Sequence, residues 1–144
     1  MPDDGGEAEK GGSMGGDLLA AVRTSGRYRT TVEAERAVRE VLAAFAGQLT
    51  GEERSAFLGA LPPETAAIVA GAVRDERRRT ASAFVDRVAA RTEGATHATA
   101  RWDASTVLTA VGVHLGAELL ERVLAQLPRG YALLFGRADL TPTV

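Results

Sequence analysis

Apolar residues recur with helical spacing in the stretch that follows residue 30. They fall at positions i, i+3, i+4, i+7 and i+11 and so form a single stripe, made of Val38, Val41, Leu42, Phe45 and Leu49. Thr30 and Glu33 have the capping-box spacing that starts a helix. The pattern predicts a long helix with one buried face, and we expect Arg36, Arg39 and Glu40 to lie away from it.

Three shorter helices are predicted around this long one. The first begins at Asp17, which can cap the free amides of the first turn. Another begins at Thr50, where Thr50 and Glu53 repeat the capping-box spacing. The last begins at Pro62 or Pro63, because proline is favoured at the first helical position. We expect its inward residues to be Ala66, Ile68 and Val69.

The same succession of elements returns 66 residues later. Residues 34–69 align with residues 100–135 without a gap, and the alignment pairs Val41 with Val107 and Leu61-Pro62 with Leu127-Pro128. A fixed internal period is the signature of a duplicated structural unit. We therefore predict an all-α protein of two tandem four-helix repeats, with a period of about 66 residues, packed into one compact body.

The composition along the chain divides it into segments. Residues 1–16 are acidic and rich in glycine, so we expect a disordered tail. Residues 17–137 are predicted to form a single helical domain. It consists of repeat one (17–69), a basic linker (70–82) and repeat two (83–135). Residues 138–144 contain Pro142 and are expected to fray.

The second long helix, predicted over residues 97–114, differs from the first. Both have an inner stripe, made here of Ala100, Ala104, Val107, Leu108, Val111 and Leu115. Its opposite face is also free of charge and consists of Trp102, Thr106, Thr109 and Val113, where repeat one has Arg36, Glu40, Ala43 and Gly47. A helix that is apolar or neutral on two faces is usually central. We therefore interpret this second face as a candidate interaction face, covered either by repeat one or by another subunit.

The linker holds the one concentration of positive charge, a candidate basic patch of Arg74, Arg77, Arg78 and Arg79. Arginine clusters can neutralise phosphates and so bind nucleic acid. Against that, the net charge of the chain is −2 and no aromatic residue is interleaved with these arginines. We interpret the patch as a solvated linker and keep weak nucleic-acid binding as the alternative.

No residue pattern indicates catalysis or a cofactor. His97 and His114 lack a metal-binding setting, and Glu52 and Glu118 lie where a carboxylate stabilises a helix N-terminus. Tyr131, in the last short helix, is expected to be half exposed. The absence of cysteine excludes disulfides and thiolate metal sites.

The chain shows no targeting segment. Acidic residues stand where a signal peptide has a basic region, and no apolar run approaches the roughly 20 residues of a membrane helix. We therefore expect a soluble cytoplasmic protein that has no contact with a membrane.

Three segments resemble the bacterial domain-of-unknown-function family 2267. They are AERAVREVLAAFAGQLTGEERSAFLGALP, FVDRVAART and VLAQLPRGYALLF, and the resemblance covers about residues 17–137. It implies a small all-helical protein with tandem repeats and no catalytic residues to carry over. Repeat one departs from the family pattern in having ALPPET, and it lacks the Gly-Trp segment that often follows.

The resulting functional hypothesis is a non-enzymatic helical module for protein–protein interaction or self-association, with no cofactor. Nucleic-acid binding is the first alternative. An enzyme with a cryptic pocket between the repeats is the second.

Overall fold

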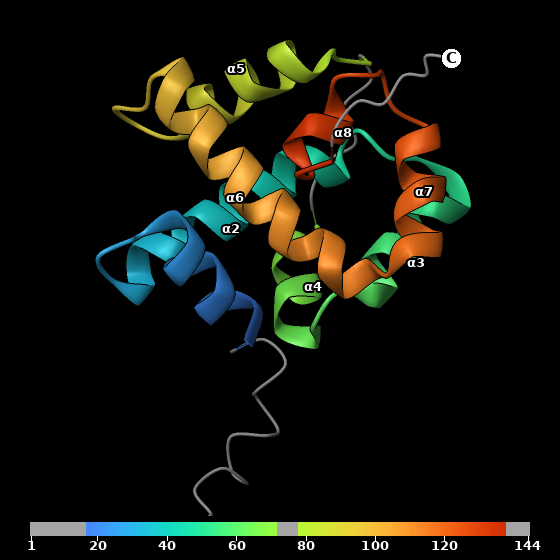
Figure 1. Cartoon of the computed structure of the whole chain (residues 1–144), viewed down its shortest axis with the longest axis horizontal. Helices are drawn as coiled ribbons and strands as arrows, with labels where there is room; N and C mark the ends of the chain where they lie inside the picture. Colours follow the sequence, from blue (N-terminus) through green and yellow to red (C-terminus); the bar gives the residue numbers. More distant parts are fainter. Residues whose placement is uncertain (1–16, 72–77, 138–144) are drawn as a thin grey trace, which may run out of the picture.

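Two long helices, α2 (Thr31–Ala46) and α6 (His97–Leu115), pack against each other at the centre of the molecule (Figure 1). The computed structural model describes residues 17–71 and 78–137. Around the central pair lie an N-terminal helix over residues 17–26 and the helices α3 (Gly51–Ala60), α4 (Pro63–Ala70), α5 (Ala81–Arg91), α7 (Ala117–Ala125) and α8 (Tyr131–Leu134). No strand occurs in the described residues, so the all-α prediction is confirmed.

The helix bounds fit the duplicated unit. An offset of 66 residues carries Thr31, the start of α2, onto His97, the start of α6, and it carries Gly51 of α3 onto Ala117 of α7. The equivalent helices also meet, because α2 packs on α6 and α3 packs on α7 (Figure 1). Such contacts between like elements are what a two-fold arrangement of two copies produces.

Local signals explain how the long helices begin. The Thr30 hydroxyl accepts a hydrogen bond from the Glu33 amide at 3.1 Å, as the capping pattern predicts. The Glu33 carboxylate accepts from the amide of Arg29, at 3.0 Å, and not from that of Thr30. At α6, Thr96 and Thr99 form a complete capping box that the sequence patterns did not indicate.

The prediction of a second capping box, at Thr50, is wrong. The Thr50 side chain makes no capping hydrogen bond. Its backbone amide instead donates to Oε1 of Gln126 at 2.9 Å. A tertiary contact between the two halves of the chain thus replaces the local cap.

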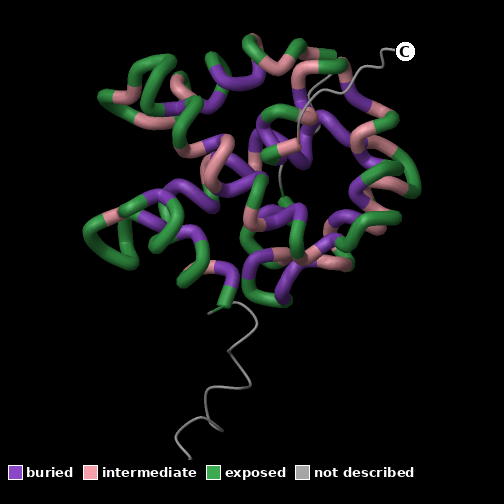
Figure 2. Tube along the Cα trace, viewed as in Figure 1, coloured by how far each residue is buried: buried purple, intermediate pink, exposed green. Residues whose placement is uncertain are grey.

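The core is formed by the inner stripes of α2 and α6, and Figure 2 shows buried residues along the sides of the helices that face one another. At its centre the Phe45 ring packs on the rings of Phe57 and Phe135, with centroids 5.3 and 5.5 Å away. Tyr131 belongs to the same aromatic cluster and is fully buried, so the expectation of half exposure is wrong. Burial costs little because its hydroxyl donates to the carbonyl of Arg79 at 3.1 Å.

The short helix α4 does not bury all of its predicted inward residues. Val69 is buried, Ala66 is partly buried, and Ile68 is 48% exposed. The inward face of α4 is formed instead by Thr65 and Val69, which are four residues apart and therefore on one side of the helix. The prediction for Ile68 is wrong, and its exposure opens a groove described below.

Candidate interaction surface

The N-terminal helix has a groove along each of two sides. One, here called the α6 groove, runs between this helix and α6. The other, here called the α4 groove, lies between the same helix, α2 and α4. Leu18 lines both grooves. Two surface grooves therefore flank one helix.

The α6 groove contains most of the face that the sequence singled out. It has a volume of about 400 Å³ and includes Thr106, Thr109 and Val113. The other lining residues are Leu18, Ala21, Ser25, Ser105, Ala110 and His114. None is an aspartate, glutamate, lysine or arginine, and most are small. A groove of this composition offers neutral walls that the backbone of another helix could approach closely.

Trp102 lies at the end of the candidate interaction face. Its indole Nε1 donates to the carbonyl of Gly26 at 3.0 Å, and the side chain remains half exposed. Trp102 therefore ties the end of the N-terminal helix to α6. This part of the face is covered, in part, by repeat one.

The remainder of the face stays open within the described residues. Val113 is 80% exposed, Thr109 is exposed, and Thr106 is half buried. The Thr109 hydroxyl donates to the carbonyl of Leu134 at 3.3 Å, so this residue also supports the following turn. Repeat one thus does not cover the end of the face at Val113, and cover by another subunit stays a prediction.

A second hydrogen bond joins the N-terminal segment to α6. The Tyr28 hydroxyl donates to Oδ1 of Asp103 at 2.5 Å. Burial, reinforced by this bond, raises the pKa of Tyr28. Burial also raises the pKa of Asp103, while the hydrogen bond from Tyr28 opposes that shift. Together with the Trp102 hydrogen bond, this contact ties the end of the N-terminal helix, which forms one wall of the α6 groove, to α6.

The candidate basic patch is only partly within the described residues. Arg74 and Arg77 lie outside them. The Arg78 guanidinium donates to the carbonyl of Gln126, and the Arg79 amide donates to Oε1 of Gln48 at 2.9 Å. The two arginines of the patch that the structure describes thus anchor the segment before α5 to the body of the protein.

The histidines and glutamates considered for chemistry are not gathered into a site. His97 Nδ1 lies 2.6 Å from Asp86 Oδ1, at the surface. Glu52 and Glu118 are both exposed. In the described part of the chain, no three histidine, cysteine, aspartate or glutamate side chains could hold a metal ion together. Among the same residues, no helix has the length and apolar character needed to cross a membrane.

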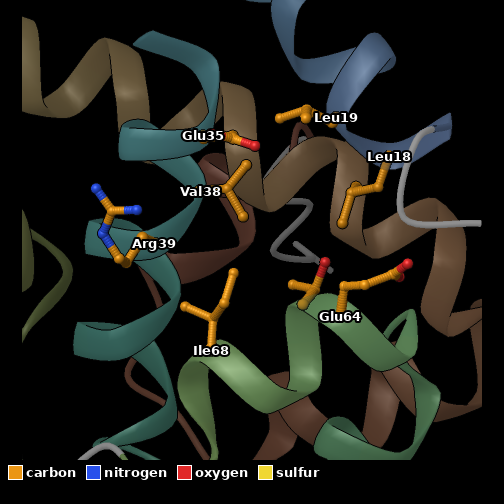
Figure 3. Close-up of a pocket in the computed structure, with 8 residues that line it drawn as sticks. Leu18, Leu19, Glu35, Val38, Arg39, Glu64 and Ile68 are labelled. Carbon is orange, nitrogen blue, oxygen red and sulfur yellow. The ribbon is translucent and has the colours of Figure 1, made fainter. Parts of the chain in front are cut away.

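Sequence reasoning missed the α4 groove. Figure 3 shows Leu18 and Leu19 from the N-terminal helix, Glu35 and Val38 from α2, and Glu64 and Ile68 from α4 arranged around one space. Arg39 and Thr65 complete the lining, and the groove has a volume of about 320 Å³. The pattern of apolar positions contains no signal for it, because a groove among three helices depends on how distant elements pack. Repeat two has a groove of about 440 Å³ at the equivalent place, where Val85, Arg101 and Leu134 are the counterparts of Leu19, Glu35 and Ile68.

Comparison with known proteins bears on the family and not on the site. No curated protein matches the chain. A family model described as an uncharacterized conserved protein (DUF2267) matches residues 16–134, a span that includes both grooves and every described helix. The chain therefore belongs to the DUF2267 family.

Proposed function

We propose that this protein is a non-enzymatic interaction module that binds the apolar face of a helix, from a partner or from a second copy, in the α6 groove. The observation that carries the proposal is the exposure of Val113, 80% of which is open to solvent beside a groove without charged residues. Covering this uncharged groove and the exposed aliphatic side chain at its rim with another apolar surface is favourable, because apolar area is removed from water.

The shape of the groove favours a helix as the bound element. Ala21 and Ser25 stand on one wall, and Ser105 and Ala110 stand on the other. Short side chains let two helix backbones approach closely, and amphipathic helices are a common ligand of grooves between helices. The tie between Trp102 and Gly26 holds the walls before a ligand arrives, which lowers the entropy cost of binding.

Two substitutions of the same kind test the proposal. Val113→Arg places a charge on the groove, whereas Val32→Arg changes another exposed valine, 65% exposed, that lines none of the grooves described. Both variants should stay folded, because neither valine is in the core.

The measurement is self-association by light scattering, together with quantitative capture of host proteins on the immobilised chain. Val113→Arg should lose the association that wild type and Val32→Arg retain. If all three proteins give the same oligomeric state and the same captured set, the α6 groove is not the binding surface.

A further inference from the structure

Repeat two has a groove of its own between the start of α5, the start of α6 and α8, here called the α8 groove. It has a volume of about 440 Å³ and lies at the place in repeat two that corresponds to the α4 groove. Its lining includes Val85 and Leu134, which are buried, and Leu133, which is 50% exposed. A large aliphatic side chain is thus open to solvent in this groove, and covering it would remove apolar area from water.

The charged residues that line the α8 groove are basic. Arg101 and Arg129 are exposed, and no aspartate or glutamate belongs to the lining. His97 lines the groove as well, but its Nδ1 lies 2.6 Å from Oδ1 of Asp86, so that side chain has an acidic partner. Arg101 makes no ion pair in the part of the chain that the structure describes. Repeat one has Glu35 at the equivalent position, so the fold does not require a cation there.

The start of α5 adds to the positive charge of the α8 groove. Ala81, the first residue of α5, and Ser82 both line the groove. The first turn of α5 contains no acidic residue, whereas the first turns of α2, α3, α4 and α7 each contain at least one. Because the N-terminal end of a helix carries a partial positive charge, α5 would stabilise an anionic group in the groove together with the arginines.

We propose that the α8 groove is a second docking site, which binds an acidic amphipathic segment of a partner protein. An aliphatic side chain of that segment packs on Leu133, and its carboxylates pair with Arg101 close to Arg129 and the start of α5. The α8 groove shares no lining residue with the α6 groove, so the site is separate and goes beyond the function proposed above.

The lining favours a protein segment over nucleic acid. Several of its residues are aliphatic, and none is an aromatic residue on which a base could stack. Residues 1–16 of the chain itself are acidic, but they contain six glycines and no leucine, isoleucine, valine or aromatic residue. They would supply carboxylates without the apolar anchor. A partner segment that combines acidic and apolar residues fits both halves of the lining.

The probes are two fluorescein-labelled helical peptides of about 18 residues, long enough to form a helix in water. Both have the same apolar face, and they differ only in carrying glutamate or lysine beside that face. Binding to the full chain is followed by fluorescence anisotropy at about 50 mM and about 300 mM salt, because screening separates charge pairing from apolar contact. The glutamate peptide should bind about tenfold more tightly than the lysine peptide at the lower salt, and this preference should shrink at the higher salt.

Two variants locate the binding, and a third is the matched control. Arg101→Glu installs the residue that repeat one has at the equivalent position and should remove the preference for the glutamate peptide. Leu133→Ala should weaken binding of that peptide about fivefold at both salt concentrations, because salt does not screen an apolar contact. Arg87→Glu changes an exposed arginine of α5 that lines none of the grooves described and should bind as wild type does. All three residues are exposed, so the variants should stay folded, which circular dichroism checks.

Several results would overturn the proposal. They are equal affinity for both peptides, the absence of binding, an unchanged preference in Arg101→Glu, or an unchanged affinity in Leu133→Ala. Val113→Arg should keep wild-type affinity for the glutamate peptide. If it loses that affinity, the peptide binds in the α6 groove, and only the inference about the α8 groove fails.

Two further measurements test other occupants. If a labelled single-stranded oligonucleotide binds more tightly than the glutamate peptide and needs Arg101, the groove is a nucleic-acid site and the proposal is wrong. Replacement of the four acidic residues in 1–16 by their amides should leave the affinity for the glutamate peptide unchanged. A gain of about tenfold would instead identify this segment of the chain as the occupant, since a tethered ligand competes at high effective concentration.

Discussion

The Tyr28 hydroxyl and the Asp103 carboxylate, 75 positions apart in the sequence, form a hydrogen bond of 2.5 Å that ties the loop after the N-terminal helix to α6. The counterparts of these residues 66 positions away are Gly94 and Ala37, which cannot form such a bond. The contact therefore has no equivalent between Gly94 and Ala37. It lies at the end of the N-terminal helix, which borders both grooves.

Tyr28→Phe should lower the free energy of unfolding by about 1–2 kcal/mol at neutral pH, because the carboxylate loses a hydrogen-bond donor. The deficit should shrink as the pH rises above about 10. There the unfolded chain releases the Tyr28 proton while the folded protein, in which the pKa of Tyr28 is raised, keeps it, and this loss of stability occurs in wild type alone. Denaturant unfolding between about pH 7 and 11 measures the difference. Parallel profiles for the two proteins would contradict the pKa shift.

Leu61 and Leu127, equivalent in the two repeats, should be equally sensitive to truncation. Both are buried, so Leu61→Ala and Leu127→Ala should each lower the free energy of unfolding by about 2–5 kcal/mol. Thermal and denaturant unfolding of both variants test this, with exposed Leu133 replaced by alanine as the control. A loss confined to one repeat would count against equivalent packing.

Trp102→Phe should lower the free energy of unfolding by about 0.5–1.5 kcal/mol, since it removes the hydrogen bond to the Gly26 carbonyl. Because Trp102 is the one tryptophan in the chain, tryptophan fluorescence reports on the surroundings of this residue alone. The wild-type emission should shift to longer wavelength on unfolding. Emission typical of a fully exposed indole in the folded protein, with unchanged stability in the variant, would show that the contact is absent.

Trp102→Arg distinguishes the two kinds of cover for the candidate interaction face. It should destabilise the monomer if the contact with the N-terminal helix is the main one. It should leave a folded monomer in place of a larger wild-type species if another subunit packs there. Light scattering and a thermal melt on this variant give the answer, and a change in neither would show that the face is not packed at Trp102.

The nucleic-acid alternative makes its own prediction. If the arginine patch binds phosphates, wild type should bind DNA or RNA at about 50 mM salt, and replacement of Arg77, Arg78 and Arg79 by glutamine should abolish binding and its salt dependence. Arg78 also holds the carbonyl of Gln126, so the variant needs a stability control. We expect no binding by wild type, and an electrophoretic shift that the replacement removes would revive the alternative.

Helical periodicity in the sequence determined the architecture. The stripes from Val38 to Leu49 and from Ala100 to Leu115 lie in the core as predicted, because a spacing of three and four residues places side chains on one helix face whatever packs against it. The succession of helices fits the internal period of 66 residues, and the composition of Trp102, Thr106, Thr109 and Val113 indicated the uncharged face of α6. These properties are local or follow from self-similarity, so a single sequence contains them.

The tertiary structure decided which side chains those faces meet. Tyr131 is buried because Phe45 and Phe84 surround its ring and the Arg79 carbonyl accepts a hydrogen bond from its hydroxyl, and none of these partners is near it in sequence. Ile68 lines the α4 groove and is 48% exposed, whereas its counterpart Leu134 is 3% exposed, although the helical pattern places both at the same position of the repeat. Burial in short helices such as α4 and α8 depends on packing between distant elements, and the grooves exist only where that packing is incomplete.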